Sequence, residues 1–257
     1  MDNEVKRKLE EASKLITEAM EIMDASAKSP VFEEKLEMAS KGYGVLWDYN
    51  SGATKCKRIG FGSGEFADPV PAKGPDEMGS SPFDALYPWS GMMKYYISSD
   101  RRISALPFDS DCDEMVYIPK FWYMAYKSER SHAWLWSVSP TEQKGFKEHP
   151  GSGRFIGRFH TSYFEFEAHS ASGKMPLTCT SWDDFKDLSE DKGPGWGMLD
   201  INTWSALQML YLIEFADFDS QMTLGEGAVN DDWKVTETDG CTKYHTVKAT
   251  GSHNLYR

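Results

Sequence analysis

The sequence lacks the long apolar runs and paired cysteines that mark membrane proteins and disulfide-rich proteins. No apolar run among the 257 residues reaches the roughly 18 residues of a membrane-spanning helix. The amino terminus also lacks the basic-then-apolar pattern of a signal peptide. The four cysteines, Cys56, Cys112, Cys179 and Cys241, are far apart and form no C-x-x-C pair. This spacing argues against a zinc ribbon or a thioredoxin-type motif, and we predict a soluble globular protein with free thiols.

Basic residues are too few for a protein that binds nucleic acid. The chain has 28 Lys and Arg against 40 Asp and Glu, which gives a formal net charge of -12. Phosphate backbones are bound by concentrated basic faces, and none is visible in the sequence. We interpret the acidic excess as a source of solubility.

Motifs of the common catalytic and cofactor-binding sites are also missing. The sequence has no G-x-S-x-G elbow, P-loop or Rossmann glycine pattern. The glycine-rich residues 60–64 open no amphipathic helix, so they do not predict a phosphate site. The six histidines show no H-x-x-x-H or H-E-x-x-H spacing that would predict a metal site. We therefore predict a protein that is not an enzyme.

One acidic run resembles the opening of a calcium loop. Its carboxylates alternate at Asp109, Asp111 and Asp113. The EF-hand pattern fails further on, because Glu114 stands where the loop needs Gly and Lys120 stands where it needs Glu. Acidic runs of this kind are usually solvated. We interpret this one as a solvated turn and expect no cofactor; if the chain binds calcium, these three aspartates are the predicted ligands.

The amino-terminal part has helical periodicity without Gly, Pro or aromatic residues up to residue 28. Its apolar positions alternate at spacings of four and three, as in a coiled-coil seam: Val5, Leu9, Ala12, Ile16, Ala19 and Met23. Self-association and packing of a single amphipathic helix on its own domain both fit this pattern. Ser29-Pro30 ends the helix, and residues 31–40 predict a second, short helix. We assign residues 1–40 to a helical oligomerisation or attachment segment and residues 41–257 to a second domain.

The second domain is rich in glycine, proline and aromatic residues and short of regular periodicity. Short apolar runs between turn clusters predict strands at residues 43–47, 115–118, 121–126, 133–138 and 163–168. In the last of these, Phe164 and Phe166 alternate with Glu165 and Glu167, which predicts one buried and one wet face. Together with the helices, these runs indicate a loop-rich α+β domain.

A tight glycine-aromatic loop at residues 193–197 leads into a helix that ends near Ala216 and is apolar on nearly every side. Such helices lie inside domains, so we predict that the rest of the fold is built around it. Glu214 and Gln208 on this helix then need polar partners. A general acid with a raised pKa is one reading, and hydrogen bonding to loop amides, which we favour, is the other.

The order of several motifs resembles that of tail-associated structural and adhesin proteins of bacteriophages. The segments that carry the likeness are YGVLWD at 43–48, SPFDALYPW at 81–89, MVYIPKFWY at 115–123, GFKEHP at 145–150, SGKMP at 172–176, GWG at 195–197, DSQ at 219–221 and GEG at 225–227. The similarity runs from about residue 43 to about residue 230. No single motif is diagnostic, but their shared order is fairly specific.

The resemblance implies a C-type-lectin-like fold, in the variant that formylglycine-generating enzymes and phage variable tropism proteins also use. In that fold, small twisted sheets and two helices support a display surface made of loops. The oxidase activity needs a pair of cysteines near the carboxyl end, where Cys241 stands alone, so the enzyme reading is not supported. Such proteins continue into a glycine-asparagine-tryptophan segment, whereas this sequence stops at Arg257; the terminal lobe is then either shortened or completed from elsewhere.

The resemblance also implies a place and partners for the protein. We expect a virion protein on the outside of a phage tail or capsid, made in the host cytoplasm. Such proteins are often trimers attached through the amino terminus, so the expected partners are further copies of the chain, other virion proteins and a host surface glycan or protein. A structural connector or decoration protein without a receptor role is the alternative. A glycan-acting hydrolase is disfavoured because no carboxylate pair with a defined scaffold is visible.

The nine tryptophans divide into two groups by position. We predict that those in or near the family-like motifs belong to the structural core: Trp47, Trp89, Trp122, Trp196 and Trp204. The others fall in less patterned segments and are the predicted ligand-binding residues, because indole rings stack on the apolar faces of sugars: Trp134, Trp136, Trp182 and Trp233. Gln208 and Glu214 complete the predicted structural set.

Overall fold

The computed structural model describes residues 29–61, 63, 66–70, 79–108, 112–172 and 174–224. Helices and antiparallel sheets are mixed along the chain, so the predicted α+β class is confirmed. The coiled-coil-like helix predicted before residue 29 lies outside these residues. Within the described ranges, no helix is long and apolar enough to cross a membrane.

Two sheets and a hairpin contain the strands. The larger sheet has the order β2-β1-β7-β6-β8 and is antiparallel throughout. Its strands are β1 (Tyr43–Asp48), β2 (Lys57–Gly60), β6 (Trp122–Ser128), β7 (Ala133–Ser139) and β8 (Lys147–Glu148). The second sheet, of order β4-β3-β5-β9, contains β3 (Lys94–Ile97), β4 (Ile103–Ser104), β5 (Asp113–Ile118) and β9 (Arg154–Gly157). The hairpin pairs β10 (Thr161–Phe164) with β11 (Glu167–Ser170).

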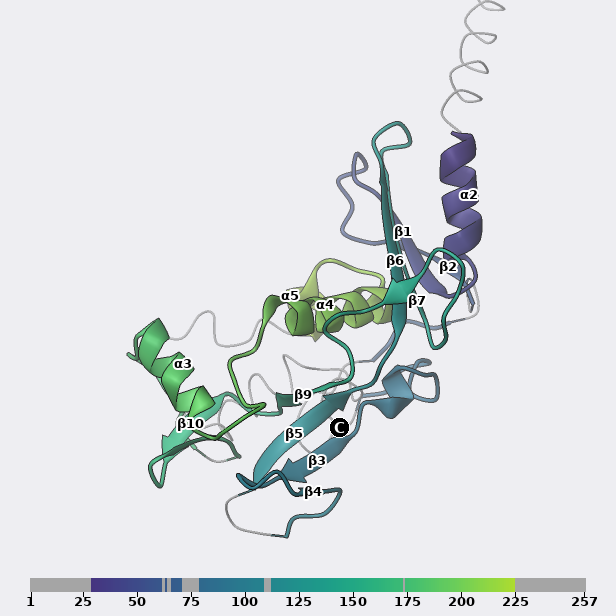
Figure 1. The fold of residues 1–257 in the computed structure, drawn as a ribbon. Coiled ribbons are helices and arrows are strands. Elements are labelled where there is room, and N and C mark those ends of the chain that lie inside the picture. Colours follow the sequence, from purple (N-terminus) through teal and green to yellow (C-terminus); the bar gives the residue numbers. More distant parts are fainter. Residues whose placement is uncertain are drawn as a thin grey trace, which may run out of the picture.

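The helix α4 (Ile201–Phe215) lies between the two sheets, as Figure 1 shows. It packs on β1 and β7, and the same core cluster takes Val116 and Ile118 from β5. The Asp200 side chain caps the helix by accepting from the Thr203 amide at 2.7 Å. At the other end, Ala216 adopts the left-handed conformation at φ 52° and ends the helix. The central helix predicted from the sequence is therefore confirmed.

The helix α2 (Pro30–Ala39) covers the opposite face of the larger sheet. Side chains alternate between the faces of a strand, so Leu135 and Met124 point toward α2 while Val138 and Val45 point toward α4. The predicted short helix at residues 31–40 is confirmed. At the other end of the molecule, α3 (Trp182–Glu190) lies beside β11, far from α2 (Figure 1). The short α5 (Ser220–Leu224) follows α4.

Four of the five predicted strands are confirmed, as β1, β5, β6 and β7. The prediction of one strand at residues 163–168 is wrong. Glu165 and Phe166 both have positive φ, at 54° and 70°, and they form the turn between β10 and β11. Phe166 is therefore 90% exposed instead of buried. The Phe–Glu alternation predicted one continuous strand, but a two-residue turn reverses the chain in the middle of this segment.

The structural side chains predicted on and beside α4 differ in burial according to their position along the helix. Glu214 is fully buried, as predicted. Trp204 is 45% exposed and Gln208 is exposed, so their assignment to the core is wrong. Trp196 is half-buried beneath the ammonium group of Lys192, 4.7 Å from the ring centroid. The side chains of α4 are buried on nearly every side only toward the carboxyl end of the helix.

His149 is a buried histidine that the fold keeps neutral. Its ring stacks on Phe121 at 5.0 Å, and its Nδ1 accepts a hydrogen bond from the Gly151 amide at 3.1 Å. Burial, and then the charge of Lys147, lower the pKa of His149 to about 4 from its ordinary value of 6.5. The unfolded chain therefore binds a proton that the folded chain lacks between these two values.

This difference predicts a pH-dependent loss of stability. The contribution of His149 is complete above pH 6.5 and falls by about 1.4 kcal/mol for each pH unit down to about pH 4. Urea unfolding between these limits, compared with His149→Phe, measures it, because the variant keeps every carboxylate that also titrates. The stability difference between the two proteins should change with this slope. A difference that stays constant with pH would contradict the prediction.

Candidate functional site

The candidate site is the part of the larger sheet that extends beyond α4. Trp47 on β1 lies opposite Trp134 on β7, and Trp136 lies two residues along β7, so all three side chains point to the α4 face. The helix covers the neighbouring Val45 and Val138 but leaves the tryptophans half-buried. Phe218, just after α4, joins them and is 41% exposed. We call Trp47, Trp134, Trp136 and Phe218 the aromatic strip.

The rings of the strip contact one another in sequence. Trp134 and Trp136 stack with their planes 6° apart and their centroids 5.1 Å apart. Phe218 contacts Trp136 at 5.8 Å and Trp47 at 4.6 Å. The Trp47 indole nitrogen donates to the Ala53 carbonyl at 2.7 Å, which fixes the position of that ring. The strip is therefore an ordered and partly exposed aromatic surface.

Polar groups border the strip at the β6–β7 hairpin. The Tyr49 hydroxyl donates to a carboxylate oxygen of Glu129 at 3.0 Å, and Lys127 forms an ion pair with the same carboxylate. The hydrogen bond from Lys127 and then that from Tyr49 lower the pKa of Glu129, while the bond to Glu129 raises the pKa of Lys127. Near neutral pH, the border thus presents one ammonium, one carboxylate and one protonated phenol.

This arrangement can bind a ligand but offers no evident chemistry for a reaction. Aromatic faces with polar groups at their edge bind sugar rings, since the rings contact the apolar faces and the polar groups hydrogen-bond the hydroxyls. The ionisable groups of the border bond to one another, and no activated nucleophile lies among them. The arrangement is therefore suited to binding a ligand.

The structure brings together two of the four predicted ligand-binding tryptophans, Trp134 and Trp136. Trp182 is the first residue of α3 and is 65% exposed, but it lies at the other end of the molecule (Figure 1). Trp233 lies outside the described residues. Trp47, predicted as core, is half-buried in the strip, whereas Trp89 is fully buried as predicted and Trp122 is half-buried.

Asp113, a predicted calcium ligand, is engaged in a buried ion pair. One carboxylate oxygen lies 2.6 Å from the Lys192 ammonium, and the other accepts from the Ser170 amide at 2.6 Å. The side chains of Asp113 and Lys192 are only 2% and 4% exposed. Asp109 and Asp111 lie outside the described residues. Among the residues described, no group of three His, Cys, Asp or Glu is placed to hold a metal ion, and Asp113 is a structural residue.

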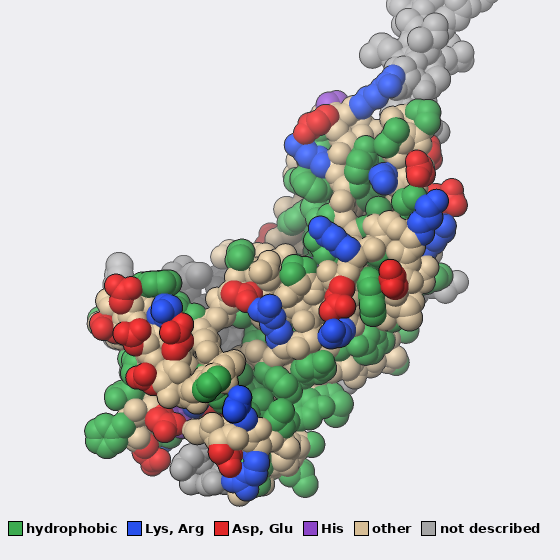
Figure 2. All heavy atoms as spheres, in the orientation of Figure 1, with side chains coloured by type: hydrophobic (Ala, Val, Ile, Leu, Met, Phe, Trp, Pro, Cys, Tyr) green, Lys and Arg blue, Asp and Glu red, His purple; other side chains and the backbone are tan. Residues whose placement is uncertain are grey.

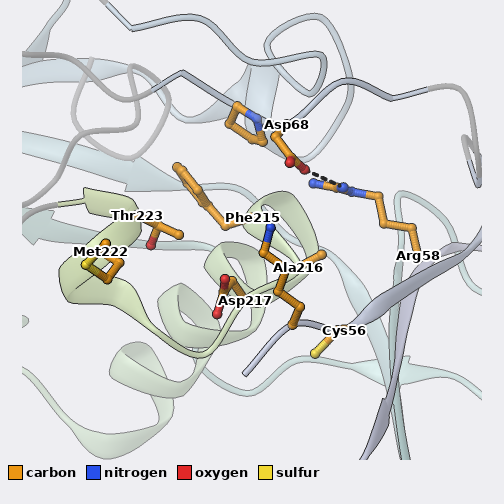
Figure 3. A pocket seen from close by; sticks show the side chains of 10 residues that line it. Cys56, Arg58, Asp68, Phe215, Ala216, Asp217, Met222 and Thr223 are labelled. Atoms are coloured by element: carbon orange, nitrogen blue, oxygen red, sulfur yellow. Dashed lines mark hydrogen bonds and ion pairs between the residues drawn. The ribbon is translucent and has the colours of Figure 1, made fainter. Parts of the chain in front are cut away.

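A pocket of about 290 Å³ lies between α5, the end of α4 and the segment before β2 (Figure 3). Its charged Arg58 already bonds Asp68 at 3.2 Å and the Glu214 carbonyl at 2.6 Å. Burial, and then the nearby Asp217, raise the pKa of the lining Cys56 to about 12. The thiol is therefore protonated and a poor nucleophile. Cys112 and Cys179 are also free, while Cys241 lies outside the described residues.

Sequence reasoning missed Phe218, Tyr49 and Lys127 as parts of the site. Phe218 comes from a distant segment, and no local pattern links it to the strands. The alternation of Trp134 and Trp136 in a short strand was a usable signal, since it puts both rings on one face. The same alternation puts Lys127 on that face, but only once the register between β6 and β7 is known.

No protein-family model, no curated protein and no solved structure matches the chain.

Proposed function

We propose that the protein is a non-enzymatic virion protein of a bacteriophage, placed on the outside of the tail or capsid, that binds a host surface glycan or protein through the aromatic strip. The observation that carries the proposal is the strip itself. The parallel rings of Trp134 and Trp136, with Trp47 and Phe218 beside them, stay half-buried or exposed at the end of a sheet. Large ordered aromatic surfaces of this kind mark binding sites.

The order of the motifs and the architecture support the rest of the proposal. A central helix between small antiparallel sheets, with long irregular connections, fits the C-type-lectin-like fold that the sequence motifs imply. In this reading, the residues before α2 connect the domain to further copies of the chain and to the virion. Recognition then belongs to the surfaces that the central helix holds in place.

A structural connector or decoration protein is the second candidate, because of another exposed apolar surface. At the start of α4, Leu199 is 52% exposed, Ile201 is 74% exposed and Trp204 is 45% exposed. A connector would bury this surface against other virion proteins, as interfaces bury apolar side chains. An adhesin needs the strip but not this surface for binding.

The test is an array of bacterial surface polysaccharides and oligosaccharides, probed with the full-length chain. Trp134→Ala and Trp136→Ala should each weaken binding at least about tenfold, since an aromatic contact contributes on the order of 1 kcal/mol beyond its buried area. Trp182→Ala is the matched control, because it removes an exposed tryptophan far from the strip, and should leave binding unchanged. Urea unfolding checks that the variants remain folded.

Two results would overturn the proposal. Loss of binding in Trp182→Ala, with binding kept in both strip variants, would move the site to α3. The absence of any binding, combined with stable co-assembly with virion proteins in light scattering, would favour the connector.

A further inference from the structure

The edge of the larger sheet beside the aromatic strip carries two lysines on the face of the strip. Lys127 lies directly opposite Trp134 in the register of β6 and β7, and Ala125 lies opposite Trp136. On the other side of β6, Lys147 of β8 lies opposite Tyr123. Residues opposite each other in an antiparallel pair point to the same face. Both ammonium groups thus lie on the side of the sheet that bears the tryptophans.

Aromatic rings hold both lysines close to the sheet. The Lys147 ammonium lies 5.1 Å from the centroid of the Tyr123 ring. That of Lys127 lies 5.4 Å from the Tyr49 ring and 5.9 Å from the Trp134 ring. A cation over a ring is oriented by the ring quadrupole but keeps its full charge. The lysines therefore present positive charge at a fixed place beside the stacking surface.

Lys147 is the lysine whose charge is available to a ligand. Lys127 is ion-paired with Glu129, whereas Lys147 has no carboxylate within ion-pair distance among the residues that the structure describes. Its neighbour Glu148 points to the other face of the sheet, where it pairs with Lys120 at 3.0 Å. Lys147 is thus an exposed cation on the strip face that contacts the ring of Tyr123.

The surface between the two lysines is open. Ala125 stands between Tyr123 and Lys127 along β6 and is exposed, because its methyl group fills little of the space beside Trp136. Residues four apart on a strand are separated by about 13 Å. A ligand that touches both lysines is therefore longer than one sugar ring and crosses Ala125 with Trp136 alongside.

A group of exposed carboxylates lies at the other end of the molecule. Figure 2 shows acidic side chains crowded over α3, at the end of the molecule opposite α2. The exposed carboxylates of that end are Glu165, Glu167, Asp183, Asp184, Asp187, Glu190 and Asp191. The net charge of -12 is thus compatible with an available positive charge at Lys147, because charges beyond about 10 Å are largely screened at physiological salt.

We propose that the ligand of the aromatic strip is an acidic oligosaccharide, whose carboxylate, sulfate or phosphate group binds Lys147 while its sugar rings stack on Trp134 and Trp136. This inference rests on the proposed function and specifies its ligand class. Lys147 favours ligands that carry negative charge, and the tryptophans contact the sugar rings.

The test uses full-length protein, with oligogalacturonate as the acidic probe and a neutral dextran oligosaccharide of the same length. Calorimetry at low and high salt should show tighter binding of oligogalacturonate, weakened by salt. Lys147→Gln should weaken it about threefold and Lys147→Glu about tenfold, the range of exposed charge pairs. Binding of the neutral probe should not change. Lys186→Gln on α3, a partly exposed lysine far from the strip, is the control and should bind like the parent.

The possible results separate this inference from the proposed function. If the neutral and acidic probes bind equally and Lys147→Glu has no effect, the acidic-ligand inference is wrong while the proposed function stands. If neither probe nor any array glycan binds, the glycan-binding part of the proposed function is contradicted together with this inference. Tighter binding of a single-stranded oligothymidylate, lost in Trp134→Ala, would show a nucleic-acid ligand and overturn both. Near-UV circular dichroism establishes that the lysine variants are folded.

Discussion

Replacing Asp113 with alanine is expected to lower the free energy of unfolding by about 3 to 5 kcal/mol, because the ammonium of Lys192 would stay buried without its counter-ion. Lys192 is only 4% exposed and also donates to the Ala168 carbonyl at 2.6 Å. Asp113 belongs to β5, Ala168 belongs to β11, and Lys192 follows α3. The ion pair thus joins three elements, and its loss should loosen the whole end of the molecule that carries α3.

Urea unfolding followed by tryptophan fluorescence measures the effect. The matched control is Glu190→Gln, which breaks the exposed pair with Lys186 at 3.2 Å and should cost less than about 0.5 kcal/mol. The double variant Asp113→Asn, Lys192→Met should recover part of the loss, since it removes both charges. A cost below about 1 kcal/mol for Asp113→Ala would mean that water reaches this pair in solution.

Local patterns in the sequence predicted the elements that carry strong periodicity. The helix up to Ala216 and the strands around Val45, Val116 and Leu135 have runs of apolar residues that fit one structure only. Prediction was wrong at Phe166, because the alternating sequence fits both a continuous strand and a hairpin. Only the positive φ of Glu165 and Phe166 shows that the chain turns there. Prediction was also wrong at Trp204, because a helix that looks apolar all round is enclosed only where other elements reach it.

The site was predictable only to the extent that it lies within one strand. Trp134 and Trp136 share a face through the two-residue period of β7, so their joint exposure could be anticipated. Lys147, Ala125 and Phe218 reach the same surface through strand register and through the path of the chain after α4. The contacts of Lys147 with Tyr123 and of Phe218 with Trp136 join segments 24 and 82 residues apart, and nothing local in a single sequence specifies them.

Gly151→Ala is the second change expected to have a large effect, because the first turn of α4 occupies the space that a side chain would need. A Cβ at Gly151 would lie 2.0 Å from the backbone oxygen of Asn202 and 2.2 Å from its carbonyl carbon. Neither side can easily move. The Gly151 amide bonds His149, and the following Gly153 amide donates to Ile118 at 2.8 Å. We expect a loss of more than about 3 kcal/mol.

Gly197→Ala provides the control from the same part of the fold, because no atom lies within 4 Å of a Cβ at that position. It should change the free energy of unfolding by less than about 0.5 kcal/mol. The difference in stability between the two variants tests the contact between residue 151 and α4 directly, since both glycines lie near the first turn of the helix but only Gly151 touches it. Because α4 supports the face of the sheet from which the aromatic strip extends, Gly151→Ala should also weaken glycan binding at temperatures where the variant is partly unfolded. Equal stabilities for the two variants would mean that this loop does not contact α4.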